Sequence, residues 1–262
     1  MGAAKTLREH WPEYLIEAWA LGMFMISAGV VTAAFEAPAS PLNAALANAD
    51  LRRALIGIAM GLTAIALIHS PWGQRSGAHM NPAVTLTFWR LGKVARWDAV
   101  FYVAAQCIGG TIGVLAVKAL LGAAFTAPPV SYVVTVPGDA GTAVAFVAEV
   151  LISTLLMAVV LTVSNSTRHA RFTGLCAGAL VAIFITVEAP LSGMSMNPAR
   201  SFASAWPADI WTAFWIYLVA PVLGMHAAAW WHTRRGTRAA CAKLLHPESQ
   251  RCIHCGHETV RP

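Results

Sequence analysis

Long apolar runs dominate the chain, and their lengths predict helices that cross a membrane. A crossing needs about 20 apolar residues, and tilt or flanking residues can complete the two shorter runs. The predicted spans are residues 14–34, 54–69, 99–121, 142–163, 172–187 and 210–231. A helix satisfies its own backbone hydrogen bonds inside lipid. The pattern therefore predicts an all-α membrane protein with six transmembrane helices.

A tripeptide occurs twice where a short helix would begin. The copies are Asn81-Pro82-Ala83 and Asn197-Pro198-Ala199, each with Met before Asn and Gly four residues before it. Asn is a preferred helix N-cap, and Pro suits the first helical position. Stop signals follow soon after, at Leu91-Gly92 and at Trp206-Pro207. We interpret residues 82–90 and 198–205 as re-entrant half-helices, because both are too short to cross a bilayer.

The second half of the chain repeats the first. Glu17 has a counterpart in Glu149, and Gly57-x-x-x-Gly61 has one in Gly174-x-x-x-Gly178. Each half holds three crossings, an odd number, so the halves are predicted to form an inverted repeat. The half-helices then enter from opposite sides and meet near the midplane. We predict one channel domain over residues 1–232, with repeats at about 12–121 and 142–232, and a cytoplasmic polar tail over 233–262.

Charge supports a membrane location and predicts an orientation. Charged residues make up 11% of the chain, against about 25% in soluble proteins, and the mean hydropathy is +0.60. The net charge of +6 does not indicate nucleic acid, because the cations sit at the ends of apolar runs. The first run is expected to stay as an anchor. Most Lys and Arg fall on one side, which predicts cytoplasmic termini in the plasma (cell inner) membrane; the exceptions are Arg52, Arg53, Lys118 and Arg200.

Two opposed half-helices predict a pore that excludes cations and protons. Their N-terminal ends place partial positive charge at the centre. Each Asn has a carbonyl oxygen to cap its helix and an amide group left to donate. A water oxygen can accept both donors, and water held this way does not relay protons. Glu17 and Glu149 are expected to brace the re-entrant loops through backbone N–H groups; the alternative is a proton relay or an ion site.

These features resemble the aquaporin, or major intrinsic protein, family, of bacterial type, over about residues 12–232. The resemblance rests on residues 76–85, on residues 197–202 and on the paired glutamates. It implies a homotetramer in membrane lipid with one pore per subunit. It also implies a filter near the outer mouth, formed by Met60, Ile185, Met194 and Arg200, with Gly61 as an alternative to Met60. His79, in the family motif, is expected either to line the cytoplasmic vestibule, where it could sense pH, or to bond loop backbone.

The filter residues match neither of the family's best-known patterns. Strict water channels of the family commonly have Phe and His on helices two and five, and its glycerol facilitators have Trp and Gly. Met60, Ile185 and Met194 are apolar, and methionine adapts its shape. We expect a passive channel for water and small neutral solutes such as hydrogen peroxide or ammonia. The alternatives are a channel mainly for another neutral solute such as glycerol, a secondary transporter, or a structural protein; no catalytic constellation indicates an enzyme.

The tail carries a motif of its own. Cys252-x-x-Cys255 resembles half a zinc knuckle, because this spacing brings two thiolates to one metal. Cys241, His246 or His257 could complete the ligand set. The alternative interpretation is a solvated basic tail without metal. No other cofactor is expected.

Overall fold

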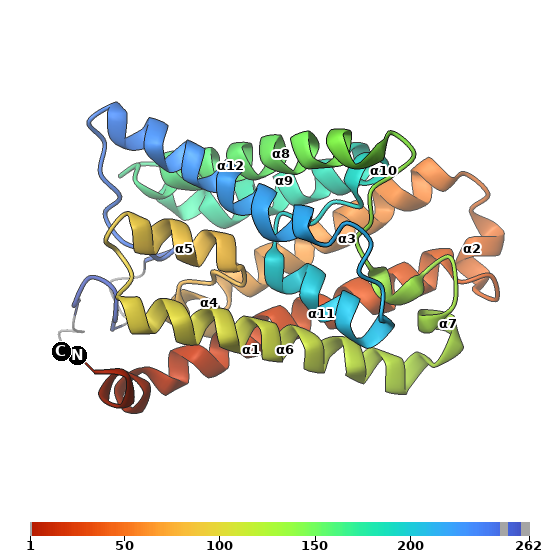
Figure 1. Ribbon diagram of the computed structural model, residues 1–262, viewed down its shortest axis with the longest axis horizontal. Coiled ribbons are helices and arrows are strands. Elements are labelled where there is room, and N and C mark those ends of the chain that lie inside the picture. The colour runs from red at the N-terminus through yellow and green to blue at the C-terminus, as the bar shows by residue number, and fades with distance from the viewer. Residues whose placement is uncertain (1, 247–250, 258–262) are drawn as a thin grey trace.

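The computed structural model describes residues 2–246 and 251–257, and this part of the chain forms a helical bundle without strands (Figure 1). The long helices are α1 (Ala3–Glu36), α3 (Ala49–His69), α6 (Arg96–Leu121), α8 (Gly141–Ser164), α9 (Thr173–Val187) and α12 (Trp215–Arg234). The half-helices are α5 (Pro82–Arg90) and α11 (Pro198–Ala208). Short elements connect them: α2 (Pro41–Ala45), α4 (Pro71–Ser76), α7 (Ala123–Thr126), α10 (Ala189–Ser192) and the 3-10 turns η1 (Ser131–Val133) and η2 (Ala170–Phe172).

Five of the six predicted crossings coincide with helices that are long and apolar enough to span a membrane: those containing α1, α3, α6, α8 and α9. The sixth, α12, has a comparable length of 20 residues. It contains Pro221, His226 and three tryptophans, and it is not among the described helices that meet both criteria. It nevertheless packs along α8 as one of the bundle's closest helix pairs, and the chain is a multi-pass membrane protein.

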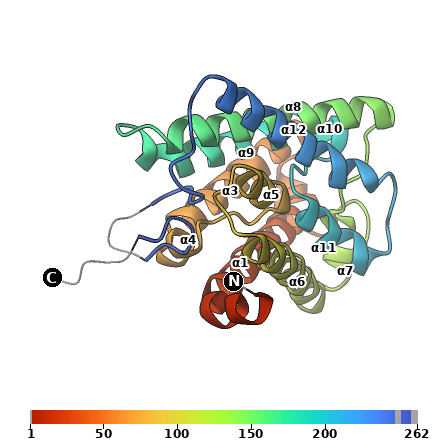
Figure 2. The same ribbon diagram turned by 60° about the vertical axis from the view of Figure 1, so that its left-hand side comes forward.

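Helix packing reproduces the internal repeat. Helix α1 packs along α6, and its repeat counterpart α8 packs along α12. Helices α3 and α9, which are themselves counterparts, pack on each other. Each half-helix crosses to the other half, with α5 against α12 and α11 against α6 (Figures 1 and 2). Exchanging the two halves therefore leaves the set of contacts unchanged, as an inverted repeat requires.

Glycines bring α3 and α9 into close contact. A Cβ atom on Gly61 would lie 2.5 Å from the Gly178 carbonyl oxygen, and a Cβ on Gly178 would lie equally close to the Gly61 oxygen. A Cβ on Gly57 would lie 2.6 Å from the Ala182 oxygen. Small residues at such a crossing let two backbones approach each other. The paired Gly-x-x-x-Gly patterns therefore mark one shared interface.

Two predicted boundaries near α11 were wrong. Trp206-Pro207 does not stop the half-helix, which continues to Ala208 and ends at Asp209, where φ is 53°. Pro207 lies in the last turn, where the loss of one backbone N–H is tolerated and the left-handed residue provides the stop. The sixth span then begins at Trp215 rather than at residue 210, because the intervening residues form turns.

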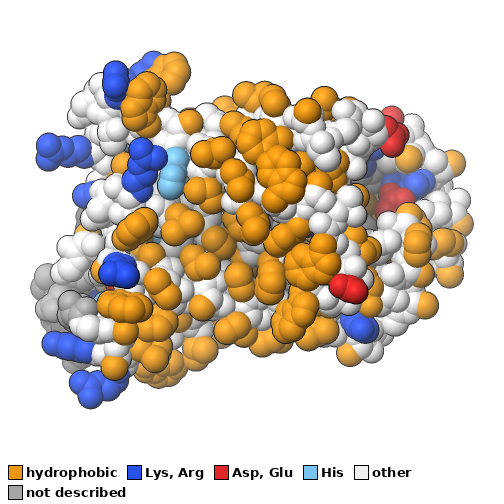
Figure 3. Space-filling model, in the orientation of Figure 1, with side chains coloured by type: hydrophobic (Ala, Val, Ile, Leu, Met, Phe, Trp, Pro, Cys, Tyr) orange, Lys and Arg blue, Asp and Glu red, His pale blue; other side chains and the backbone are white. Residues whose placement is uncertain are grey.

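The start of α1 and the described tail residues after α12 lie at one end of the bundle, which we call the termini end (Figure 1). Most Lys and Arg side chains visible in Figure 3 gather at this end, and hydrophobic side chains cover the middle of the visible face. Exposed apolar residues such as Leu62, Ile112 and Leu151 are 60–62% accessible. An apolar belt with a cationic end is the surface expected of a membrane-embedded protein.

Candidate pore

The half-helices α5 and α11 begin at the two asparagines, as the sequence predicts. The Asn81 Oδ1 atom accepts a hydrogen bond from the Ala83 N–H at 2.8 Å. The Asn197 Oδ1 atom accepts from the N–H groups of Ala199 at 3.1 Å and Arg200 at 3.2 Å. These caps satisfy N–H groups that a helix start leaves without partners.

Each asparagine also ties the two re-entrant loops together. Asn81 Nδ2 donates to the Met196 carbonyl oxygen at 2.7 Å, and Asn197 Nδ2 donates to the Met80 oxygen at 2.7 Å. Both methionines have left-handed backbone, with φ of 50° and 54°, a strained conformation that the reciprocal bonds help to hold. An amide NH2 carries two hydrogens. One amide hydrogen of each asparagine therefore binds the opposite loop, and the other remains for a molecule in the pore.

Glu17 holds the first re-entrant loop in place. Its Oε1 atom accepts from the Ser76 hydroxyl at 2.7 Å and from the His79 N–H at 3.0 Å. Its Oε2 atom accepts from the Met80 N–H at 2.7 Å and from Gln106 Nε2 at 2.9 Å. The carboxylate is fully buried. Four donors around one buried carboxylate form a bracing site, and they leave no carboxylate oxygen without a partner.

Glu149 forms the equivalent site on the second loop. Its Oε1 atom accepts from the Ser192 hydroxyl at 2.8 Å and the Ser195 N–H at 2.6 Å, and Oε2 accepts from the Met196 N–H at 2.8 Å. Both glutamates thus engage the residue just before the Asn of their own loop. This arrangement favours bracing over a proton relay, because the carboxylate oxygens are occupied by fixed donors.

Sequence reasoning missed a second set of paired braces. Tyr102 on α6 donates its hydroxyl to the Ser76 carbonyl oxygen at 2.8 Å, and Tyr217 on α12 donates to the Ser192 oxygen at 2.6 Å. Both serines begin a Ser-Gly pair whose glycine has a positive φ, 104° at Gly77 and 80° at position 193. The signal was present: each Ser-Gly pair precedes its motif, and each tyrosine follows at nearly the same offset.

A cavity of about 500 Å³ passes between the loops. Its volume would hold roughly 15 water molecules at about 30 Å³ each. Both motif asparagines line it, together with all four filter candidates: Met60, Ile185, Met194 and Arg200. Gly61, the alternative to Met60, is not part of the lining and instead packs against Gly178. The wall is largely apolar at the filter, where Arg200 supplies the charge.

Arg200 keeps hydrogen-bonding capacity in reserve. Among the described residues, its Nη1 atom is buried and has no hydrogen-bond partner. Glu149 lies close enough to interact electrostatically with the guanidinium. An arginine has five N–H donors and no acceptor. A solute at this point would therefore meet an N–H donor and a positive charge.

His79 lines the cavity, as one of its two predicted roles requires, but its ring bonds the backbone of the tail rather than that of its own loop. Its ring lines the cavity and is buried. Its Nδ1 atom lies 3.0 Å from the Thr85 hydroxyl, and its Nε2 atom lies 2.8 Å from the Ala242 carbonyl oxygen. The second partner belongs to the C-terminal tail, and Leu244 of the same tail segment also lines the cavity. The tail thus reaches the termini end of the pore.

The interpretation of a solvated tail holds for residues 235–238, which are exposed, but was wrong for residues 242–244 and for Cys252. Ala242, Lys243 and Leu244 are 0–6% exposed, and Cys252 is 1% exposed. Burial, with a smaller contribution from nearby His79, lowers the pKa of His254 to about 4. Apolar side chains of the tail pack against the loop residues at the mouth of the cavity, because burial of apolar surface is favourable.

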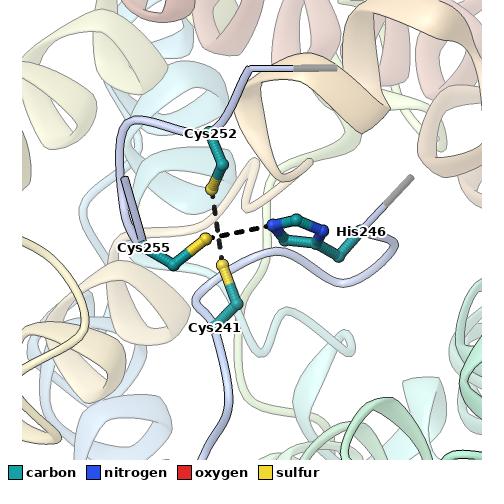
Figure 4. A group of neighbouring side chains, drawn as sticks. All are labelled: Cys241, His246, Cys252 and Cys255. Carbon is teal, nitrogen blue, oxygen red and sulfur yellow. Dashed lines mark hydrogen bonds between the residues drawn. The ribbon is translucent and has the colours of Figure 1, made fainter. Parts of the chain in front are cut away.

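Four of the five tail side chains that the sequence offers as ligands come together (Figure 4). The Sγ or ring nitrogen atoms of Cys241, His246, Cys252 and Cys255 all lie within 4.8 Å of one another. His257 is not in this group; its ring contacts that of His246 edge-on, with centroids 5.5 Å apart. Cys107 and Cys176 lie in α6 and α9, outside the group.

Opposed half-helices within an inverted repeat of membrane-length helices define a class of membrane protein with a central, loop-lined cavity. A model of the family described as "Major intrinsic protein" matches residues 5–232. The chain therefore belongs to the major intrinsic protein family. Residues 233–262 lie beyond this match.

Relatives agree with the assignment. The chain is 38% identical over 177 residues to "Aquaporin NIP1-3" of Oryza sativa subsp. japonica, covering 67% of this chain and 59% of that protein. It is 37% identical over 182 residues to "Probable aquaporin AqpM" of Archaeoglobus fulgidus, covering 67% and 73%. The chain spans less than two thirds of the length of the plant relative. An aquaglyceroporin structure from Plasmodium falciparum matches the fold with a TM-score of 0.71 and 21% identity, covering 85% of this chain and 95% of that one.

Proposed function

We propose that the chain is a passive membrane channel that conducts water and small neutral solutes while excluding protons and ions. The observation that carries the proposal is the pair of asparagines, each with one free amide hydrogen at the junction of two helix N-termini. The cavity lining includes both of them. Transport of this kind involves no covalent chemistry, which agrees with membership of a family of channel proteins.

Exclusion follows from charge and from hydrogen-bond geometry. The N-terminal ends of α5 and α11 each contribute about half a positive charge at the junction, and Arg200 adds a full charge along the same cavity. A cation there would lose its hydration and meet positive potential on each side. A water molecule that accepts from Asn81 and Asn197 directs its own hydrogens away from the junction, so a proton wire through this point is interrupted.

Solute choice falls to the filter. Met60, Ile185 and Met194 offer no hydrogen-bonding group apart from the weakly accepting thioethers, and Arg200 supplies N–H donors. Such a filter offers a polar solute donors on the Arg200 side alone, so it holds the orientation of the solute weakly. The apolar side chains on the opposite wall accommodate the apolar surface of the solute. This composition supports passage of small neutral solutes beside water. It also favours the second candidate, a channel mainly for a polyol such as glycerol, whose carbon side would contact the methionines.

Stopped-flow light scattering on proteoliposomes tests the proposal. The osmotic water permeability should exceed that of empty vesicles, with a low temperature dependence, and an imposed pH gradient should not collapse faster. Parallel measurements with glycerol and hydrogen peroxide separate the two candidates. Water permeability equal to that of empty vesicles would refute the water channel, and saturable, ion-coupled uptake would indicate a transporter.

The proposal also includes the membrane, the orientation and the oligomeric state of the channel. Clustered cations at the termini end support a cytoplasmic location of both termini in the plasma membrane. The exposed apolar belt supports burial against lipid and against three further copies in a homotetramer. Protease access to a C-terminal tag in sealed spheroplasts tests the orientation. Native mass spectrometry from detergent tests the tetramer, and a monomer under mild conditions would count against it.

A further inference from the structure

The four-residue cluster of the tail has the composition of a structural metal site. Cys252-x-x-Cys255 supplies two thiols, and Cys241-x-x-x-x-His246 supplies a thiol and an imidazole. Three sulfurs and one nitrogen are a common ligand set of structural zinc sites. The ligands come from two separate segments of the tail, residues 241–246 and 251–257 (Figure 4). A metal would therefore join the two segments.

The distances suit a tetrahedral ion. Zn–S bonds of about 2.3 Å and Zn–N bonds of about 2.0 Å imply edges of about 3.5–3.8 Å between ligand atoms. The Cys241 and Cys252 sulfurs lie 3.5 Å apart, and His246 Nε2 lies 3.1 Å from the Cys255 sulfur. These are two opposite edges of one tetrahedron, and all ligand atoms stay within 4.8 Å. A disulfide between Cys241 and Cys252 would explain one edge but not the convergence of His246 and Cys255.

Backbone geometry around the cysteines points the same way. The N–H groups of His254 and Cys255 donate to the Cys252 sulfur, and the N–H of Lys243 donates to the Cys241 sulfur. Metal ligands are commonly held in place by such outer hydrogen bonds. The turn closes at Gly256, whose φ is 72° and whose N–H donates to the Cys252 carbonyl oxygen at 3.1 Å. Glycine adopts that conformation without strain.

Residues 242–244, between Cys241 and His246, and His254, in the Cys-x-x-Cys turn, contact the mouth of the pore. Leu244 donates its N–H to the Gly77 carbonyl oxygen at 3.2 Å. The Ala242 carbonyl oxygen lies 2.8 Å from His79 Nε2. His254, within the Cys-x-x-Cys turn, stacks on His79 with ring centroids 5.8 Å apart and lies 3.3 Å from the Tyr102 hydroxyl. Both tail segments that supply the cluster therefore contact the re-entrant loop that contains the first Asn-Pro-Ala motif.

We propose that Cys241, His246, Cys252 and Cys255 form a tetrahedral zinc site that fastens the C-terminal tail over the termini end of the pore. The metal joins the tail segment that contains Leu244 to the segment that contains His254. Without the metal, this short segment has little secondary structure to hold it against the loop, because a zinc module of this size owes its folding to the ion. Zinc binding thus sets how far Leu244 obstructs the cavity. The claim that the tail obstructs permeation rests on the proposed function, whereas the claim that the tail binds zinc does not.

Metal analysis of the purified full-length chain tests the site. The protein, prepared without a histidine tag and under reducing conditions, should contain one zinc per chain. The double variant Cys252→Ser/Cys255→Ser should contain none. The matched control, Cys107→Ser/Cys176→Ser, removes two thiols outside the cluster and should keep the zinc. Cobalt substitution gives a second readout, since tetrahedral thiolate coordination produces intense visible absorption. A reduced wild-type protein without zinc, or equal zinc in both double variants, would overturn the proposal.

Permeability measurements test the fastening. A membrane-permeant zinc chelator and the Cys252→Ser/Cys255→Ser variant should both increase the water permeability of proteoliposomes. Leu244→Ala should increase it while keeping the zinc, and the neighbouring control Leu245→Ala, whose side chain is outside the cavity lining, should not. If zinc is bound but the water permeability changes neither with the chelator nor in Leu244→Ala, the tail does not obstruct the pore and this part of the proposal is overturned. If no version conducts above empty vesicles, the proposed function fails, while the zinc content still decides the site.

Discussion

Replacing Glu17 with glutamine is expected to release the first re-entrant loop. The buried carboxylate accepts four hydrogen bonds, two on each oxygen: from the Ser76 hydroxyl, the His79 N–H, the Met80 N–H and Gln106 Nε2. Glutamine keeps the size of the side chain but presents an NH2 group where one oxygen was. Two donors would then face another donor. The side chain itself would still fit, so the effect isolates hydrogen bonding from packing.

The magnitude follows from the number of bonds lost. A hydrogen bond to a charged group contributes about 1.5–3 kcal/mol, so two lost bonds cost about 3–6 kcal/mol. Removal of a buried charge offsets part of this loss. We expect a net destabilisation of about 2–4 kcal/mol. Glu149→Gln should behave similarly, because its three bonds engage the equivalent atoms of the second loop.

Melting temperature in detergent and water permeability in proteoliposomes measure the two consequences. Glu17→Gln should lower both, since Met80 and Asn81 lose their fixed positions at the junction. Glu9→Gln is the matched control, because Glu9 lies on the same helix, is exposed and forms an ion pair of 3.8 Å with Lys5 on the surface. A Glu17→Gln protein with the melting temperature and permeability of the Glu9→Gln control would refute the bracing role.

Three further outcomes are expected. Met60→Phe with Ile185→His should narrow the filter and add a polar ring, lowering the glycerol-to-water permeability ratio; an unchanged ratio would contradict the filter assignment. Gly61→Ala should lower the melting temperature, because its Cβ would lie 2.5 Å from the Gly178 oxygen, whereas Gly2→Ala, with nothing within 4 Å, should not. Glu188→Gln should stabilise the protein at neutral pH by about 1–3 kcal/mol, because burial raises the pKa of this carboxyl to about 8 and so opposes its charged form in the folded state; a lower melting temperature would show that the carboxylate is needed.

Much of the architecture could be read from local signals. Asn followed by Pro predicted the start of both half-helices at Pro82 and Pro198, and the first half-helix also ends where predicted, at Arg90. These features depend on short-range capping and backbone geometry. Apolar run length predicted the spans. Errors arose where local signals compete: a proline near a helix end looks like a stop, but the residue that ends α11 is Asp209, in a left-handed conformation that its sequence does not announce.

Packing partners, in contrast, were decided by the tertiary structure. Met60 and Gly61 are neighbours in sequence, and only the close approach of α3 to α9 turns one to the cavity and the other to Gly178. The spare amide hydrogen of each asparagine is another example. The sequence predicts only that each amide group can donate at the pore; the structure shows that one of its hydrogens binds the opposite loop, because two loops distant in sequence meet at the junction.

The tail shows the same division. Residue types and the Cys-x-x-Cys spacing by themselves determined that a zinc half-site was available. Whether His246 or His257 joined it, and whether the segment was solvated, depended on how the chain folds back after α12. Burial of Ala242 and Leu244 on the first re-entrant loop is a long-range apolar contact, and no local pattern encodes its partner. The sequence alone determined the spans and the starts of the half-helices, because these follow from neighbouring residues. The tertiary structure decided which groups bond across the junction and what covers the pore, because those contacts join residues far apart in the chain.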